Sequence, residues 1–137
     1  MESIKAMNIQ VGDLCFTPDG IAKKGLLVRH LVMPGYESEG VKIMKWMADN
    51  VSRDVFVNIM EQYHPSAHVG KFKSGRSSTA STELGGHAMD KQTMSKVRYG
   101  EINRPITKEE LSTVRIAAER AGLWRFCDPP RHDGFSL

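Results

Sequence analysis

The sequence predicts an α/β chain whose neighbouring strands run parallel. Residues 26–33, Leu-Leu-Val-Arg-His-Leu-Val-Met, form a near-continuous apolar run closed by Pro34, which is typical of a strand buried on both faces. Residues 55–60 form a second short run rich in β-branched side chains. Residues 38–50, between the two runs, have the apolar spacing of a helix. Two strands joined by a helix through short connections form a right-handed βαβ crossover, which makes the strands parallel.

The predicted helix at 38–50 has one apolar side, and Ser38 is placed to cap its N-terminus. The apolar side is formed by Val41, Met44, Met47, Ala48 and Val51. Lys42, Lys45 and Asp49 lie on the opposite side, in solvent. We therefore expect this helix to pack on the sheet through its methionines.

The chain before the first strand predicts a helix and a small hairpin. Residues 2–11 carry apolar side chains three and four positions apart, and Gly12 stops this amphipathic helix. Residues 14–17 and 21–22 flank a Pro-Asp-Gly turn, which predicts a hairpin. Because the helix starts without a cap, we expect its beginning to be missing.

The composition divides the chain into four parts. Residues 1–68 and 100–125 contain the core-forming side chains. Residues 69–99 are rich in Gly, Ser, Thr and Lys, and such a segment buries too little apolar surface to offset the entropy of ordering. We therefore expect 69–99 to be a disordered insertion and 126–137 to be a disordered tail.

The last helix is predicted near 108–121. Thr107 and Glu110 have the spacing of a capping box, in which each side chain accepts a hydrogen bond from the other residue's backbone N–H. Gly122 is well placed as the residue just after the helix. The apolar side is formed by Leu111, Val114, Ala118 and Ala121.

Charge and cysteine content exclude several classes of protein. Lys and Arg number 19 against 16 Asp and Glu, and this mild excess is not typical of a nucleic-acid-binding protein. No apolar run is long enough to cross a bilayer, so we expect no membrane partner. Cys15 and Cys127 are far apart and have no metal-binding or redox spacing. Their scarcity suits the cytoplasm, where we expect the protein to be found.

Polar side chains inside the two apolar runs are candidate site residues. Strand alternation places Arg29 and His30 on opposite faces, so only one of them can point into the interior of a barrel. Asn58 has apolar neighbours on both sides, and a buried amide needs a partner. That partner is either a neighbouring strand or a ligand, and the sequence leaves both alternatives open.

Four polar residues directly follow the second run: Glu61, Gln62, Tyr63 and His64. Their carboxylate, amide, phenol and imidazole groups suit a polar cofactor or substrate, although a loop that only caps the strand would have the same composition. His64 and His68 are four residues apart, but Pro65 disfavours a helix there and no third ligand is evident. We predict no metal site.

Several segments taken together resemble the C-terminal half of radical S-adenosylmethionine proteins similar to the pyruvate formate-lyase activating enzyme. The resemblance covers residues 3–68 and resumes over 100–124. Four segments carry its first part: Gln10-Val-Gly-Asp-Leu14, Asp19-Gly-Ile-Ala-Lys-Lys-Gly25, Gly25-Leu-Leu-Val-Arg-His-Leu-Val-Met-Pro34 and Val57-Asn-Ile-Met-Glu-Gln-Tyr-His-Pro65. In the family the junction that here holds 69–99 is much shorter.

The resemblance implies the C-terminal portion of a partial (β/α)6 barrel. Its later strands contact the sugar and methionine parts of S-adenosylmethionine and the substrate. The implied cofactor-binding residues here are Arg29, His30, Asn58, Gln62, Tyr63 and His64. The family also holds a 4Fe–4S cluster in a Cys-x3-Cys-x2-Cys loop, which cleaves S-adenosylmethionine reductively to a 5′-deoxyadenosyl radical. This sequence lacks that loop, so we expect the chain alone to hold neither cofactor.

Three interpretations follow from the resemblance. The chain is a fragment of a glycyl-radical-activating enzyme that is inactive alone, which is the interpretation we favour. Alternatively, it is a subunit completed by another chain that carries the cluster, or a non-catalytic α/β binding module derived from the same fold. The partner implied is a protein substrate or a chain that supplies the missing N-terminal half.

Overall fold

The computed structural model describes residues 1–71 and 97–127, which fall into two compact units. The first unit comprises Met1–Tyr63 and the chain from Ile106 onward. The second unit is His64–Pro105. The first unit is a mixed α/β structure with a parallel and an antiparallel pair of strands, and it contains the predicted site residues before His64.

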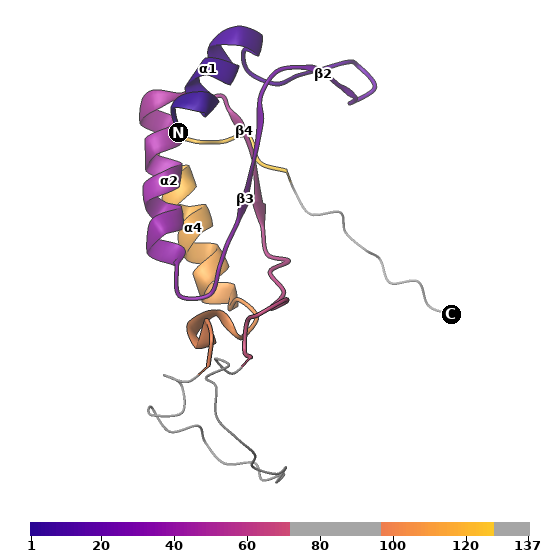
Figure 1. Ribbon diagram of the computed structural model, residues 1–137. Coiled ribbons are helices and arrows are strands. Elements are labelled where there is room, and N and C mark those ends of the chain that lie inside the picture. The colour runs from indigo at the N-terminus through magenta and orange to yellow at the C-terminus, as the bar shows by residue number, and fades with distance from the viewer. Residues whose placement is uncertain (72–96, 128–137) are drawn as a thin grey trace, which may run out of the picture. The chain divides into compact units, whose positions relative to one another are not determined.

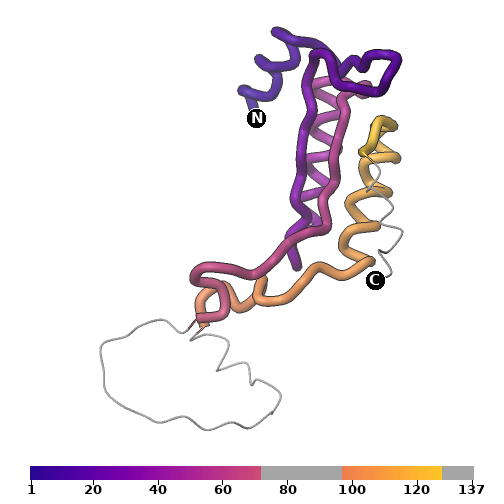
Figure 2. The backbone as a smooth tube through the Cα atoms, turned by 90° about the vertical axis from the view of Figure 1, so that its right-hand side faces the viewer, coloured from indigo at the N-terminus to yellow at the C-terminus, as the bar shows by residue number. Residues whose placement is uncertain are grey.

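A parallel βαβ unit forms the centre of the first unit, as the apolar pattern predicts. Strand β3 (Leu27–Leu31) pairs with β4 (Phe56–Met60), and helix α2 (Glu37–Asn50) connects them. The register places Leu27 opposite Phe56 and Leu31 opposite Met60. In Figure 2 the two strands run next to each other, with the turns of α2 behind them. The parallel pairing therefore confirms the strand–helix–strand prediction.

The expectation that β3 is buried on both faces is wrong. Leu26 and Val32, at its two ends, are buried in the core, whereas Leu27 and Leu31 on the other face are 43% and 37% exposed. The reason is that the helices cover one face of the β3–β4 pair only (Figure 1). The other face, which we call the open face, carries Leu27, Arg29 and Leu31 from β3 and Phe56, Asn58 and Met60 from β4.

Helix α4 (Lys108–Arg120) packs beside α2 on the covered face of the sheet (Figure 1). The two helices approach closely at Gly40, where an added Cβ would lie 2.8 Å from Cγ2 of Val114. Their apolar sides meet the strands in one core, as the helical spacing predicts. The largest fully buried side chains of the core are Met44, Met47, Leu123, Val32, Val55, Val57 and Val114.

The two helices begin differently. Helix α4 has the predicted capping box: Thr107 N donates to Glu110 Oε2 at 2.8 Å, and Glu110 N donates to Thr107 Oγ1 at 3.2 Å. Gly122 adopts a positive φ of 94° just after this helix, as predicted. The prediction that Ser38 caps α2 is wrong. The Tyr36 N–H donates to the Met33 carbonyl, and this turn places Tyr36 at the N-cap, so the helix begins at Glu37.

A short third parallel segment follows α4. Val57 N donates to the Arg125 carbonyl at 2.9 Å, and Cys127 N donates to the Val57 carbonyl at 3.1 Å, so Phe126 pairs with Val57. Phe126 and Cys127 therefore do not belong to a disordered tail, which corrects the prediction for these two residues. The rest of that predicted tail, 128–137, lies outside the described residues.

The N-terminal elements agree with the sequence. Helix α1 (Glu2–Val11) ends at Gly12, and β1 (Cys15–Phe16) pairs antiparallel with β2 (Ala22–Lys24) as the predicted hairpin. Asp13 then forms a parallel β-bridge with Leu26, just before β3 and on the side of the chain that does not pair with β4. The amphipathic side of α1 is used only in part: Ile4 packs against the core, whereas Met7 and Val11 are 51% and 41% exposed.

The second unit contains the ordered ends of the predicted insertion. Gly70 N donates to the Arg98 carbonyl and Arg98 N donates to the Lys71 carbonyl, both at 2.9 Å, and Val97 is buried. A 3-10 turn, η1 (Gly100–Ile102), follows. The prediction that 69–99 is a disordered insertion is therefore wrong at its ends, because residues 70–71 pair with Arg98. Residues 72–96 lie outside the described residues.

Candidate functional site

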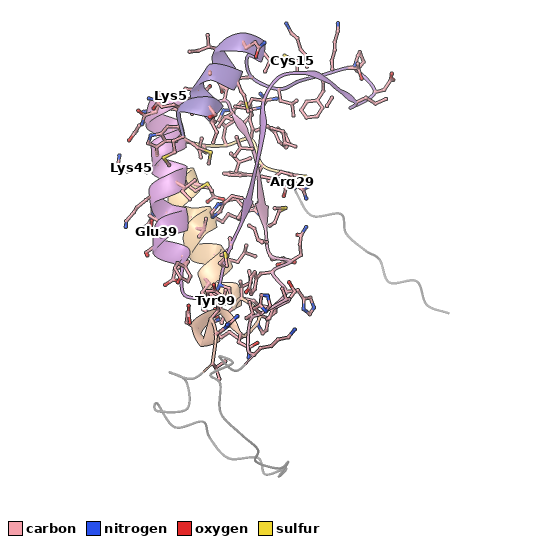
Figure 3. All side chains as sticks on the ribbon, in the orientation of Figure 1. Lys5, Cys15, Arg29, Glu39, Lys45 and Tyr99 are labelled. Carbon is pink, nitrogen blue, oxygen red and sulfur yellow. The ribbon has the colours of Figure 1, made fainter. Side chains whose placement is uncertain are left out.

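Arg29 and Asn58 occupy equivalent positions on the two parallel strands. They are register partners, so both side chains leave the sheet on the open face. Figure 3 shows Arg29 on the side of the strands away from α2 and α4. Within residues 1–71 and 97–127, neither the Arg29 guanidinium nor the Asn58 amide has a hydrogen-bond or ion-pair partner. Both groups are therefore available to a ligand on the open face.

His30 lies on the opposite face of the sheet, against the helices. Its Nε2 is 3.0 Å from the position that a Cβ on Gly40 would occupy, next to Val114 of α4. Burial lowers the pKa of this imidazole below its usual 6.5, because desolvation disfavours the charged form. Of the two central polar residues of β3, Arg29 rather than His30 therefore shares a face with Asn58, and His30 is a helix-facing residue.

A cavity of about 200 Å³ opens at the C-terminal end of β4. It combines polar groups with an apolar wall, which is the usual composition of a small-molecule site. Its lining residues come from β4 and the loop after it (Asn58, Ile59, Met60, Glu61, Gln62), from α4 (Leu111, Arg115) and from the third parallel segment (Phe126, Cys127). Asn58 and Gln62, both predicted as site residues, thus line one cavity.

The α4 side of this cavity was not predicted from the sequence. The Arg115 guanidinium lies 5.6 Å from the centre of the Phe126 ring, and its Nε is 3.7 Å from Glu119 Oε1. These contacts hold a cation at the wall of the cavity. A signal existed in the sequence, because Arg115 follows Leu111 by four residues and so lies beside the apolar side of the helix.

The remaining predicted residues are placed differently. Gln62 is exposed, and its Nε2 lies 3.7 Å from Met60 Sδ. Tyr63 is part-buried and follows a tight turn, in which its N–H donates to the Glu61 carbonyl at 2.9 Å, but it does not line the cavity. His64 is exposed and belongs to the second unit.

Arg125 closes the N-terminal end of the open face. Its Nη2 donates to the Leu14 carbonyl at 2.6 Å, and its Nη1 donates to the Asp54 carbonyl at 3.0 Å. The same guanidinium stacks over Phe56 at 5.6 Å, and Phe56 meets Phe16 of the hairpin edge-on at 5.5 Å. Since these contacts occupy the charge of Arg125, Arg29 is the arginine of the open face without a partner among residues 1–71 and 97–127.

The described residues do not provide a set of ligands for a metal ion or an iron–sulfur cluster. Among 1–71 and 97–127, no three His, Cys, Asp or Glu side chains converge. Cys15 and Cys127 are exposed and are not joined by a disulfide. A cluster needs several thiolates close together, so these residues do not fit one. No helix in the described part of the chain is long and apolar enough to cross a membrane.

Comparison of the chain with protein-family models, with curated proteins and with solved structures gave no match.

Proposed function

We propose that this chain supplies the later strands of a radical S-adenosylmethionine barrel of the pyruvate formate-lyase activating type, with the open face lining its interior. The order β3, α2, β4, α4 and then the segment at 125–127, with each strand parallel to its predecessor, supports this. Such barrels repeat strand and helix in this way and leave the inner face of the strands free of helices. The register pair Arg29–Asn58 on that face is the observation that carries the proposal.

S-adenosylmethionine matches the groups that the open face offers. A guanidinium binds a carboxylate strongly, so Arg29 would hold the methionine carboxylate. The Asn58 amide, with Gln62 beyond it at the strand end, would bind the amine or the sugar hydroxyls. Tyr63 follows Gln62 directly in sequence, whereas His30, which the resemblance also implies, faces the helices and takes no part in this proposal. When bound, this cofactor supplies the deoxyadenosyl group that radical enzymes use to abstract hydrogen.

The cluster would come from another polypeptide segment, because the described residues do not fit one. In this proposal the chain positions the cofactor and performs no electron transfer itself. Its partners are a cluster-bearing chain and a protein substrate. The scarcity of cysteine suits the cytoplasm as its compartment.

A second candidate function is a non-catalytic α/β binding module. The exposure of Leu27 and Leu31 on the open face favours it, since apolar residues around an unpaired arginine suit a protein surface that covers the sheet. This module would bind its partner through the same face but would bind no S-adenosylmethionine.

The experiment that separates these functions restores a cluster-bearing half. The chain is co-expressed with the N-terminal half of a pyruvate formate-lyase activating enzyme, the cluster is reconstituted anaerobically, and S-adenosylmethionine binding is measured by titration calorimetry. We expect saturable binding that Asn58→Leu weakens by about 1–3 kcal/mol, which is roughly 5-fold to 160-fold. Lys42→Ala, on the outer side of α2, is the control and should bind normally. A stable complex of the two chains that does not bind S-adenosylmethionine would contradict the cofactor function and favour the non-catalytic binding module.

A further inference from the structure

A groove of about 580 Å³ runs between the outer sides of α2 and α4, away from the sheet. Its lining residues are Val41 and Lys45 of α2, and Thr113, Ile116, Ala117, Arg120 and Ala121 at α4. None of them is fully buried, whereas the neighbours that face the sheet, Met44 and Val114, are. The groove is therefore separated from the open face by the helix layer and the core.

The groove is apolar along its floor because of the side chains that the two helices present there. The helices touch at Gly40 and Val114, and Gly40 directly precedes Val41 in the chain. Farther along α4, the small side chains of Ala117 and Ala121 leave space between the helices. Ile116 is 44% exposed at the rim. A groove between two helices with small residues along it can take the ridge of a third helix.

The charged residues of the groove are both cationic. Lys45 Nζ pairs with Asp49 Oδ2 at 2.8 Å, but both groups are largely exposed, so the pair contributes little and can rearrange. Figure 3 shows Lys45 on the side of α2 away from the strands. Arg120 has no ion-pair partner within the described ranges. This arrangement favours a ligand that carries carboxylates beside its apolar residues.

We propose that this groove docks an acidic amphipathic helix of another protein. Apolar side chains of the partner, spaced three and four residues apart, would lie on Val41, Ile116 and Ala117. An Asp or Glu flanking them would pair with Arg120. A second copy of this chain that docked groove to groove is a poor occupant, because Lys45 and Arg120 of one copy would face those of the other. This docking site is independent of the proposed cofactor function.

The probe is a pair of fluorescein-labelled designed helices of about 18 residues, with leucines at the spacing of one helix face. One peptide carries Glu beside the leucines, and the other carries Lys at the same positions. Fluorescence anisotropy with the full chain at low and moderate salt measures both affinities. We expect saturable binding of the Glu peptide, at least tenfold tighter than that of the Lys peptide, and weaker in higher salt.

Variants locate the binding on the protein. Ile116→Lys should abolish binding of the Glu peptide. Arg120→Glu should weaken binding of the Glu peptide about tenfold and increase the affinity for the Lys peptide. Ile9→Lys, which adds the same charge at an exposed apolar residue of α1, is the control and should bind as the wild type does. Circular dichroism checks that each variant folds. Absent binding, equal affinity for both peptides, or unchanged affinity in folded Ile116→Lys would overturn the proposal.

Discussion

Gly35 donates its backbone N–H to Glu110 Oε1 at 2.7 Å, across 75 positions of the chain. The other oxygen, Oε2, accepts from the Thr107 N–H at 2.8 Å. One carboxylate therefore caps α4 and holds the loop that leaves the C-terminal end of β3. Gly35 has a positive φ of 73°, so this loop depends on glycine as well as on the carboxylate.

Replacing Glu110 with Gln should destabilise the first unit. The amide keeps the shape of the side chain, but it loses the charge that strengthens both hydrogen bonds and interacts with the helix N-terminus. We expect a loss of about 1–2 kcal/mol in the free energy of unfolding, measured in urea, and faster hydrogen exchange at Gly35. Glu109→Gln is the matched control, since it removes the same charge from the same helical turn. Equal losses in the two variants would contradict a specific role for Glu110.

His30 should make the fold less stable in mild acid. Burial lowers its folded-state pKa below the value near 6.5 that it regains on unfolding, so the unfolded state binds the proton more readily. The part of the free energy of unfolding that depends on neutral His30 is therefore fully present above pH 6.5. This contribution is lost as the pH falls from 6.5 through the lowered pKa. Urea midpoints at pH 7.5 and 5.5 measure the loss.

His30→Gln should reduce this dependence on pH, because it removes the titrating group from the helix-facing side of β3. His68→Gln, at an exposed histidine of the second unit, is the control and should keep the wild-type dependence. A wild-type dependence in His30→Gln would mean that other groups cause the loss in acid.

Gly40→Ala should destabilise the protein although alanine favours helices. The gain in helix propensity is about 1 kcal/mol, but the new Cβ would lie 2.8 Å from Val114 Cγ2 and 3.0 Å from His30 Nε2. Overpacking of this kind costs about 1–3 kcal/mol, so we expect a net loss of about 1 kcal/mol in denaturation experiments. In a Val114→Ala background the substitution should become neutral or stabilising. A stabilised Gly40→Ala single variant would show that α2 and α4 do not meet at this residue.

Much of the fold follows from local patterns in the sequence. The apolar spacing at 38–50, the capping box at Thr107 and the hairpin turn each depend on side chains close in sequence, so their predictions were confirmed. The start of α2 at Glu37 was missed because a loop turn, rather than a capping side chain, sets it. The pairing at 125–127 could not be predicted, because the segment is short, no apolar run marks it, and its contacts with Val57, Leu14 and Asp54 form only in the folded chain.

Of the residues proposed from the sequence, Asn58 and Gln62 line one cavity, whereas His30 faces the helices and Tyr63 does not line the cavity. Alternation along β3 separates Arg29 from His30, yet only the packing of the helices decides which face is covered. Arg115 lines the same cavity as Asn58. It is 57 positions away from Asn58 in the chain and lies beside the cavity only because α4 packs there. Side chains that meet only through tertiary packing leave no local signal in the sequence.

The most direct test of the central claim is a double-mutant cycle on Arg29 and Asn58. Arg29→Met, Asn58→Leu and the double variant are each combined with the cluster-bearing half, and S-adenosylmethionine affinity is measured by calorimetry. If both side chains hold one cofactor from one face, each substitution weakens binding and the two losses deviate from additivity by more than about 0.5 kcal/mol. Wild-type affinity in all three variants, with the complex intact, would contradict the claim that the open face is the cofactor side of a barrel.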